Sequence, residues 1–149
     1  MLEQESKLKK EEKLFRERKN FIREHYPMDK SNYDFEDLIA SGLDGLKVLE
    51  RRDDTGDLEA LSTYKIDTDH EGNRYLSWGI MVTREESRGE GIFKEELQKL
   101  LNIARQNRCE YISAIADTNQ GAVALERSGF YFVQDEINKR NYYRFDLDD

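Results

Sequence analysis

The sequence predicts an α/β protein with one mixed sheet of about six strands, flanking helices and an extended N-terminal helix. Three observations favour this class. The chain opens with a long stretch free of Gly and Pro, continues as short strand-like segments separated by turns, and then places an amphipathic helical segment between two strand segments. Short turns join antiparallel strands, whereas a strand, a helix and a second strand make a parallel crossover, so the sheet is mixed.

The length and composition suit a single domain. A chain of 149 residues can bury about 68–70% of its unfolded surface, and 37% of its residues are apolar. We therefore expect one domain over residues 1–149, with an N-terminal helix within residues 1–26 and a core over residues 46–147.

Few residues are available for disulfide, metal or membrane chemistry. The single cysteine, Cys109, cannot form an internal disulfide, and no apolar run approaches the roughly 20 residues of a membrane span. His25 and His70 are too few and too scattered for a zinc site, and no Gly-x-Ser-x-Gly motif supplies a serine nucleophile. We expect a soluble, cytoplasmic protein with no membrane partner and no metal.

Negative charge is concentrated after the N-terminal segment. The net charge is −8, and residues 1–24 hold eight Lys or Arg and six Glu. The rest of the chain therefore has sixteen basic and twenty-six acidic residues, a net charge of −10. This acidity argues against a nucleic-acid partner and mildly favours a cationic one, although solubility alone explains it equally well.

The N-terminal segment from Glu3 to His25 is predicted to be helical. It is almost wholly polar up to Lys13 and then gains apolar residues near helical spacing. These are Leu14, Phe15, Phe21 and Ile22. A seven-residue spacing of Leu8, Phe15 and Ile22 leaves open a coiled-coil contact, and with it a homodimer, or a chance repeat.

The following segments continue the predicted order of elements. Pro27 ends the first helix, and a second short helix is expected from Asp34 to Ser41 with Gly42 beyond it. Three strands are expected at Leu46–Arg52, Leu58–Ile66 and Arg74–Thr83. After a helix over "GIFKEELQKLLNIARQN" we expect a strand from Tyr111 to Ala116, a helix from Gln120 to Ser128 ended by Gly129, and closing strands at "FYFVQ" and "NYYRFDL".

The stretch "EESRGEGIF", from Glu85 to Phe93, joins a strand to a helix. Gly89 and Gly91 behind Arg88 form a flexible turn that can aim backbone N–H groups at an anion. Lys94 stands where a dinucleotide motif needs its third glycine, and no Gly-Lys-[Ser/Thr] follows. An ordinary glycine turn that starts a helix is the alternative.

Two motifs in this order resemble the GNAT family of acyl-CoA-dependent N-acetyltransferases. "SRGEGIFKEEL" resembles the family's pyrophosphate loop, and "NQGAVALERSGF" resembles its second motif. The resemblance covers roughly Leu46 to Leu147. It implies transfer of an acetyl group from acetyl-CoA to a primary amine of a small molecule or peptide. The alternative is a GNAT-fold module that holds acyl-CoA or a protein partner without turnover.

The resemblance also implies a set of cofactor-binding residues. The pyrophosphate would be held by backbone N–H groups of the loop. The loop residues are Arg88, Gly89, Glu90, Gly91 and Ile92. The pantetheine arm would pair with the backbone of Gly79, Ile80, Met81 and Val82, whose side chains we expect in the core. Asn119 would hold the same arm, or else cap a helix. Glu86 departs from the family, which usually has Gln or Arg there.

The catalytic residues are less well marked by the sequence. By the resemblance, Tyr75 lies where some relatives carry a glutamate base, and Glu59 is the nearest carboxylate candidate; either could instead be an ordinary sheet residue. The family's tyrosine acid is absent, because Leu125 or Glu126 arrives at its place. Tyr131, Tyr142 or Tyr143 could substitute for it or be ordinary strand aromatics.

Overall fold

The computed structural model describes residues 2–25, 46–88, 91–116, 118–136 and 140–147. Contacts between Cα atoms group the chain into two compact units. The first unit is Met1–Thr63 with Met81–Ser87, and the second is Tyr64–Ile80 with Arg88–Asp149. The organisation as a single domain stays a prediction.

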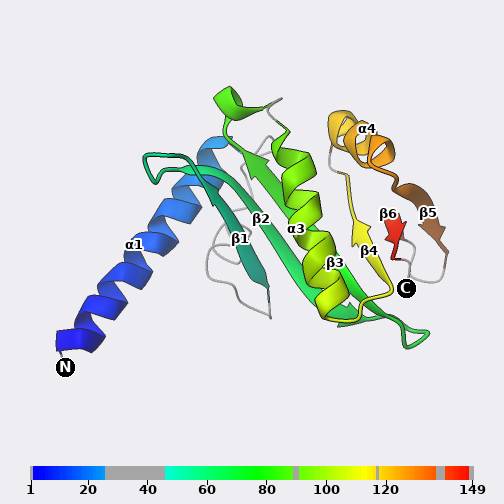
Figure 1. Cartoon of the computed structure of the whole chain (residues 1–149), viewed down its shortest axis with the longest axis horizontal. Coiled ribbons are helices and arrows are strands. Elements are labelled where there is room, and N and C mark those ends of the chain that lie inside the picture. Colours follow the sequence, from blue (N-terminus) through cyan, green and yellow to red (C-terminus); the bar gives the residue numbers. More distant parts are fainter. Residues whose placement is uncertain (1, 26–45, 89–90, 117, 137–139, 148–149) are drawn as a thin grey trace. The chain divides into compact units, whose positions relative to one another are not determined.

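The fold class predicted from the sequence is confirmed. The helices are α1 (Leu2–His25), the short 3₁₀ helix η2 (Glu85–Ser87), α3 (Ile92–Gln106) and α4 (Asn119–Arg127). The strands are β1 (Lys47–Arg52), β2 (Leu58–Thr68), β3 (Arg74–Thr83), β4 (Tyr111–Ala114), β5 (Tyr131–Asp135) and β6 (Arg140–Asp146). They form one six-stranded sheet in the order β1-β2-β3-β4-β6-β5 (Figure 1).

Helix α1 changes from exposed to buried along its length, as its sequence predicts. Leu8 is 58% exposed, whereas Phe21 and Ile22 are 7% and 1% exposed. Ile22 is thus buried in the core of its own unit, and the homodimer suggested by its spacing from Leu8 and Phe15 stays a prediction.

Within the described residues, no helix combines the length and the apolarity needed to cross a membrane.

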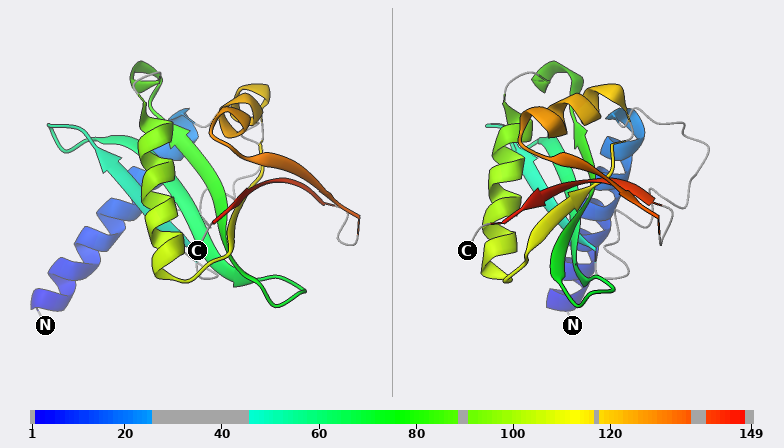
Figure 2. Two further views of the ribbon diagram at one scale, coloured as in Figure 1. Left: turned by 45° about the vertical axis from the view of Figure 1, so that its right-hand side comes forward. Right: turned by 90° about the vertical axis from the view of Figure 1, so that its right-hand side faces the viewer.

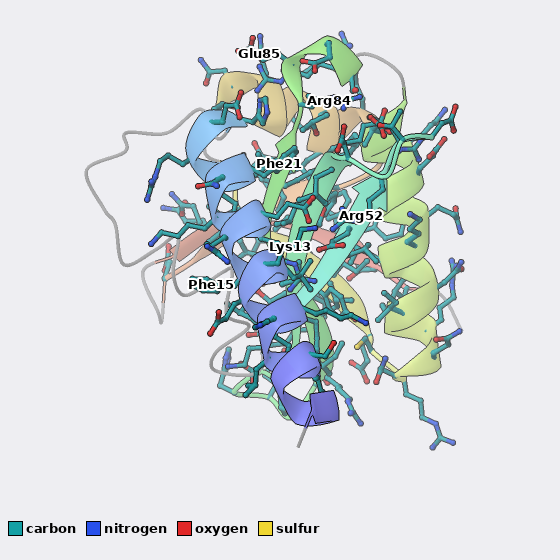
Figure 3. The ribbon with its side chains drawn as sticks, turned by 90° about the vertical axis from the view of Figure 1, so that its left-hand side faces the viewer. Lys13, Phe15, Phe21, Arg52, Arg84 and Glu85 are labelled. Carbon is teal, nitrogen blue, oxygen red and sulfur yellow. The ribbon has the colours of Figure 1, made fainter. Side chains whose placement is uncertain are left out.

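Ion pairs join α1 to β1 in the first unit. Arg52 Nη2 lies 2.8 Å from Glu17 Oε1, and Arg18 Nε lies 2.6 Å from Glu50 Oε1 (Figure 3). Arg52 also pairs with Glu50, which stands two residues before it on the same strand. Arg52 and Glu50 therefore fix the polar side of α1 against the strand while Phe21 and Ile22 fill the core.

In the second unit, α3 covers one face of the sheet beside β3 and β4 (Figure 1). The ring of Phe93 on α3 lies 5.2 Å from that of Trp78 on β3. The buried residues of α3 follow helical spacing. They are Ile92, Glu96, Leu97, Leu100, Leu101 and Ala104. This face is the amphipathic stripe expected from the sequence, with one carboxylate, Glu96, included in it.

Strands β5 and β6 form the closing hairpin and lie side by side in both views of Figure 2. They pair antiparallel from Tyr131 opposite Arg144 to Asp135 opposite Arg140. β6 also pairs antiparallel with β4. Gly129, with φ of 102°, turns the chain from α4 into this hairpin. A Cβ atom at Gly129 would lie 3.2 Å from the Phe145 ring, so both the backbone angle and the space favour glycine there.

Several predicted boundaries need correction. β4 ends at Ala114 rather than Ala116, because its pairing with both β3 and β6 stops at Ala114. α4 begins at Asn119 rather than Gln120 and ends at Arg127. β2 runs on to Thr68 instead of ending at Ile66. The short helix expected at residues 34–41, with Pro27 and Gly42 on either side, lies outside the described residues.

Candidate functional site

Strands β3 and β4 are paired over only part of their length. Their parallel register runs from Tyr75 opposite Tyr111 to Trp78 opposite Ala114, where β4 ends. β3 continues through Gly79 and Ile80 to Thr83. From Gly79 onward the backbone of β3 therefore has no β4 residue opposite it. The structure places a break in the ladder next to the strand residues expected to contact the cofactor.

The start of α3 lies just beyond the glycine loop. Gly91 precedes the helix in a left-handed conformation, with φ of 78°, and no side chain caps the helix there. The first N–H groups of a helix have no carbonyl partner within it, and they carry its partial positive charge. The sequence prediction of a glycine turn that opens a helix is confirmed at Gly91 and Ile92. Gly89 and Glu90 lie outside the described residues, and Arg88 is exposed.

An arginine in the first unit balances one of the glutamates of this region. Arg84 Nε lies 3.1 Å from Glu86 Oε1, and Arg84 Nη1 donates to Asp53 Oδ2 at 2.8 Å. Arg84 lies directly before η2 (Figure 3). The carboxylate of Glu86, which replaces the family's usual Gln or Arg, is thus directed to a cation.

The start of α4 corrects one of the two roles considered for Asn119. Thr118, not Asn119, is the N-cap, and its Oγ1 accepts from the N–H of Gly121 at 3.0 Å. Asn119 is the first helical residue and is exposed. It lines a pocket of about 480 Å³, here called the α4 pocket. The lining residues are Ile115, Ala116, Thr118, Asn119, Ala122, Phe132, Asn141 and Tyr143. The cap role is therefore wrong, and contact with the pantetheine arm stays a prediction.

Only one of the three candidate tyrosines lines the α4 pocket. The Tyr143 hydroxyl donates to Glu126 Oε1 at 3.3 Å. Burial, and then the charge of Glu126, raise the pKa of Tyr143 above its ordinary value. Leu125 is buried, with 4% of its surface exposed, whereas the Tyr131 hydroxyl donates to Asp146 at 2.7 Å. Tyr143 therefore places a hydroxyl beside Glu126, one of the two residues that can arrive at the place of the missing tyrosine.

A second, larger hollow lies in the second unit and has a volume of about 1120 Å³. We call it the tyrosine cleft. Its walls come from the β2–β3 turn, from β3 and β4, and from the β5–β6 hairpin. They are Thr68, Asp69, His70, Glu71, Tyr75, Ser77, Trp78, Gly79, Tyr111, Ser113, Ala114, Ile115, Val133, Gln134, Glu136, Tyr142 and Arg144. The cleft thus includes Trp78, Gly79 and Ala114, where the β3–β4 ladder stops.

Stacked side chains form one wall of the tyrosine cleft. The rings of Tyr75 and Tyr111 are parallel within 2°, with centroids 5.1 Å apart. The guanidinium carbon of Arg144 lies 3.8 Å from the centre of the Tyr111 ring, and Arg144 Nε pairs with Asp146 at 2.6 Å. Such a cation over an aromatic face is attractive, so the stack holds its members in place.

Asp69 fixes the turn end of the same wall. The Tyr111 hydroxyl donates to Asp69 Oδ2 at 2.7 Å, and the backbone N–H groups of Glu71 and Asn73 donate to Asp69 Oδ1. Burial opposes the charged form of Asp69, but these three hydrogen bonds outweigh it and lower its pKa. Burial and Asp69 together raise the pKa of Tyr111. The cleft therefore keeps a carboxylate ion beside a neutral phenol.

The two base candidates lie in different surroundings. Glu59 belongs to the first unit, is 8% exposed and lies 3.4 Å from Arg51, measured from Oε2 to Nε. Tyr75 is half-buried and lines the tyrosine cleft. Of the two, the described cleft includes Tyr75 only.

Two of the three strand side chains among the cofactor candidates belong to the core, as expected. Ile80 and Val82 are 7% and 1% exposed, whereas Met81 is half-buried. A contact with the cofactor at Ile80 and Val82 would thus use the backbone.

The sequence analysis missed Asp69, Tyr111 and Arg144. Alternation of Tyr111 with Ser113 was the available signal, since it marks a polar face on that strand.

Comparison with known proteins agrees with this geometry. A model of the acetyltransferase (GNAT) family matches residues 11–130. A search of curated protein sequences finds no match. Three solved structures share the fold, each at low sequence identity.

The first is a GNAT-family protein from Desulfovibrio desulfuricans, at TM-score 0.71 and 12% identity, covering 89% of this chain and 91% of that one. The second is the PaiA N-acetyltransferase of Thermoplasma acidophilum in complex with coenzyme A, at TM-score 0.66 and 12% identity, covering 93% and 94%. The third is the NatC complex bound to Gag peptide and CoA, at TM-score 0.65 and 16% identity, covering 91% of each chain.

The identities of these structures support the fold alone, whereas the family model spans most of the sequence. Together with the glycine turn before α3 and the interrupted β3–β4 ladder, that match shows that this chain belongs to the GNAT family of acetyltransferases.

Proposed function

We propose that this protein transfers an acetyl group from acetyl-CoA to the primary amine of a small molecule or peptide. One observation carries the proposal: the β3–β4 ladder ends at the same residues, Trp78 and Ala114, that line the tyrosine cleft. A strand that runs on past the end of its neighbour, as β3 runs past β4, can bind an extended chain by adding it as a further strand. An acceptor in the cleft would then meet an acyl chain held along β3.

The residues present fit acetyl-CoA as the co-substrate, without a metal. The uncapped start of α3 suits an anion, so we assign the pyrophosphate to the backbone of Arg88, Gly89, Glu90, Gly91 and Ile92. We assign the pantetheine arm to the backbone of Ile80, Met81 and Val82 and to Asn119. Coenzyme A in the PaiA and NatC structures supports this assignment by analogy of fold. Bound acetyl-CoA supplies an activated thioester.

The acceptor must lose a proton before it reacts. An alkylamine with a pKa of about 10.4 is neutral at pH 7 in only about one molecule of 2,500, and only the neutral form attacks the carbonyl carbon. We propose that Tyr75 relays this proton to water, its oxygen taking one proton as its hydroxyl gives up another, because it lines the cleft. Glu59 remains the second candidate, and its ion pair with Arg51 counts against it.

The departing sulfur needs a proton at the end of the reaction. As the new C–N bond forms, the nitrogen loses a second proton to water, and as the C–S bond breaks, its electron pair goes to sulfur as a thiolate. We propose Tyr143 as the proton donor, because its hydroxyl lines the α4 pocket beside Glu126. A thiol has a pKa near 8.5, so the thiolate can also leave unaided at a moderate rate.

The proposed activity is tested by release of free thiol from acetyl-CoA across polyamines, aminoglycosides, amino acids and peptides. We expect amine-dependent release with at least one class, and no release with acetyl-CoA alone. The absence of the family's tyrosine, at whose place Leu125 or Glu126 arrives, is the observation that favours a non-catalytic module. If acetyl-CoA binds but no amine gives turnover, the proposed activity is wrong and the non-catalytic module is the better explanation.

A further inference from the structure

The two ends of the tyrosine cleft differ in chemistry. At one end are Gly79 and Ala114, where β4 stops pairing with β3. At the other end lies the β2–β3 turn, with Asp69 and Glu71. Tyr75 stands at the turn end, because its neighbour Tyr111 bonds to Asp69. Tyr75 and Gly79 are separated by about 13 Å of extended strand. A molecule that fills the cleft is therefore long and reaches both ends.

Charges in the cleft favour a cationic ligand. Among the residues that the structure describes, its lining holds three carboxylates, Asp69, Glu71 and Glu136, and one guanidinium, that of Arg144. Arg144 is already paired with Asp146 at 2.6 Å. His70 Nε2 lies 3.7 Å from Glu71 Oε1. Even with His70 counted as a cation, the carboxylates of the described lining exceed its cations.

Asp69 is a preorganised anion rather than a flexible surface carboxylate. Three donors hold it, namely the Tyr111 hydroxyl and two backbone N–H groups of the turn. The stack of Tyr75, Tyr111 and Arg144 shows that an aromatic wall of this cleft already accommodates a guanidinium cation. Trp78 and Tyr142 add aromatic surface to the lining beside Ser77 and Ser113, and such surface suits an aliphatic chain.

We propose that the acceptor is a linear aliphatic diamine or polyamine, with its reacting amine at the Gly79 end of the tyrosine cleft and a second ammonium group beside Asp69 and Glu71. This assignment rests on the proposed function, which it deepens by naming the substrate class. The second ammonium group distinguishes the ligand from a monoamine, and the aromatic wall packs along the methylene chain of the ligand.

The test compares diaminooctane with octylamine, which has the same carbon chain and only one amine. Binding of each is measured by calorimetry with the CoA-saturated protein. We expect diaminooctane to bind at least about tenfold more tightly, and this preference to shrink as salt is raised. Glu71→Gln should remove most of the preference. Glu110→Gln, an exposed carboxylate outside the cleft lining, should preserve it.

Equal binding of the two amines, or an equal loss for both in Glu71→Gln, would overturn the assignment. The assignment would also be overturned if a peptide whose only cation is its N-terminal amine bound more tightly than the diamine. Thiol release with the same two amines then separates this inference from the proposed function. If the protein prefers the diamine in binding but shows no turnover, the ligand class stands and the acetyltransferase activity is rejected. If it shows turnover but no preference for the diamine, the activity stands and the ligand class is rejected.

Discussion

Helices α3 and α4 begin in opposite ways, although both follow a strand of the same sheet. α3 starts after a left-handed glycine, Gly91, with no side-chain cap, whereas Thr118 caps α4 through its bond to Gly121. A capping side chain satisfies one of the N–H groups that would otherwise be available to an anion. The start of α3 thus leaves its first N–H groups without a side-chain cap, which is why we propose it as the anion site, whereas the start of α4 is closed by Thr118.

The largest expected effect is the loss of cofactor binding when the α3 start is made negative. At about 100 times its dissociation constant, acetyl-CoA should stabilise the wild type by about 2.7 kcal/mol, or about 5–10 °C in melting temperature. Gly91→Asp should abolish this shift, because its carboxylate would face the pyrophosphate. Thermal melting with and without acetyl-CoA measures it.

Gly56→Asp is the matched control for backbone strain. Gly56 also has a left-handed φ, of 88°, and nothing within 4 Å of an added Cβ, like Gly91. Each variant should lose roughly 1–2 kcal/mol of stability without ligand, since a non-glycine residue is strained there. Gly56→Asp should keep the full acetyl-CoA shift. A normal shift in Gly91→Asp would instead remove the α3 start from the cofactor site.

A smaller effect is expected at the other helix. Thr118→Ala removes the α4 cap and should cost about 1 kcal/mol, or roughly 2–4 °C in melting temperature, while the shift caused by acetyl-CoA stays unchanged. Thr118→Ser should retain most of the stability because it keeps the hydroxyl. If Thr118→Ala also removed the rise in melting temperature caused by acetyl-CoA, the proposal that only the start of α3 binds the cofactor's anion would be wrong.

The smallest effect at neutral pH is expected for Tyr143 beside α4. Burial and the charge of Glu126 raise the pKa of Tyr143 above the ordinary tyrosine value, so its hydroxyl is protonated at neutral pH. The rate should therefore fall only in the alkaline range, as this acid ionises. Tyr143→Phe should remove the falling limb and change the rate at pH 7 by a few-fold or less, as measured by pH profiles of thiol release.

Tyr131→Phe and Tyr142→Phe serve as controls and should keep the falling limb. A profile that rises with pH and then stays level in the wild type would show that no enzyme group must remain protonated. The thiolate would then leave unaided, and no side chain would replace the acid that is missing at Leu125.

Local pattern in the sequence determined most of the secondary structure. The segment from Gly91 to Asn107 predicts α3 within one residue at each end, and β3 is predicted at its observed bounds, Arg74–Thr83. Gly91 marked a turn and a helix start by its residue type alone, since a left-handed φ suits glycine. These features depend on residues that are only a few positions apart. They can be predicted because the sequence itself gives the neighbours of each residue along the chain.

The tyrosine cleft and the cap of α4 were decided only by the tertiary structure. Tyr75, Tyr111 and Arg144 meet because β3, β4 and β6 are adjacent in one register, and a shift of one residue would turn each side chain to the other face. The sequence analysis considered Asn119 as a cap, but Thr118 is also a capping residue type, and the structure shows Thr118 as the N-cap of α4. Long-range pairing sets these contacts, and no local pattern encodes which distant strand a residue will face.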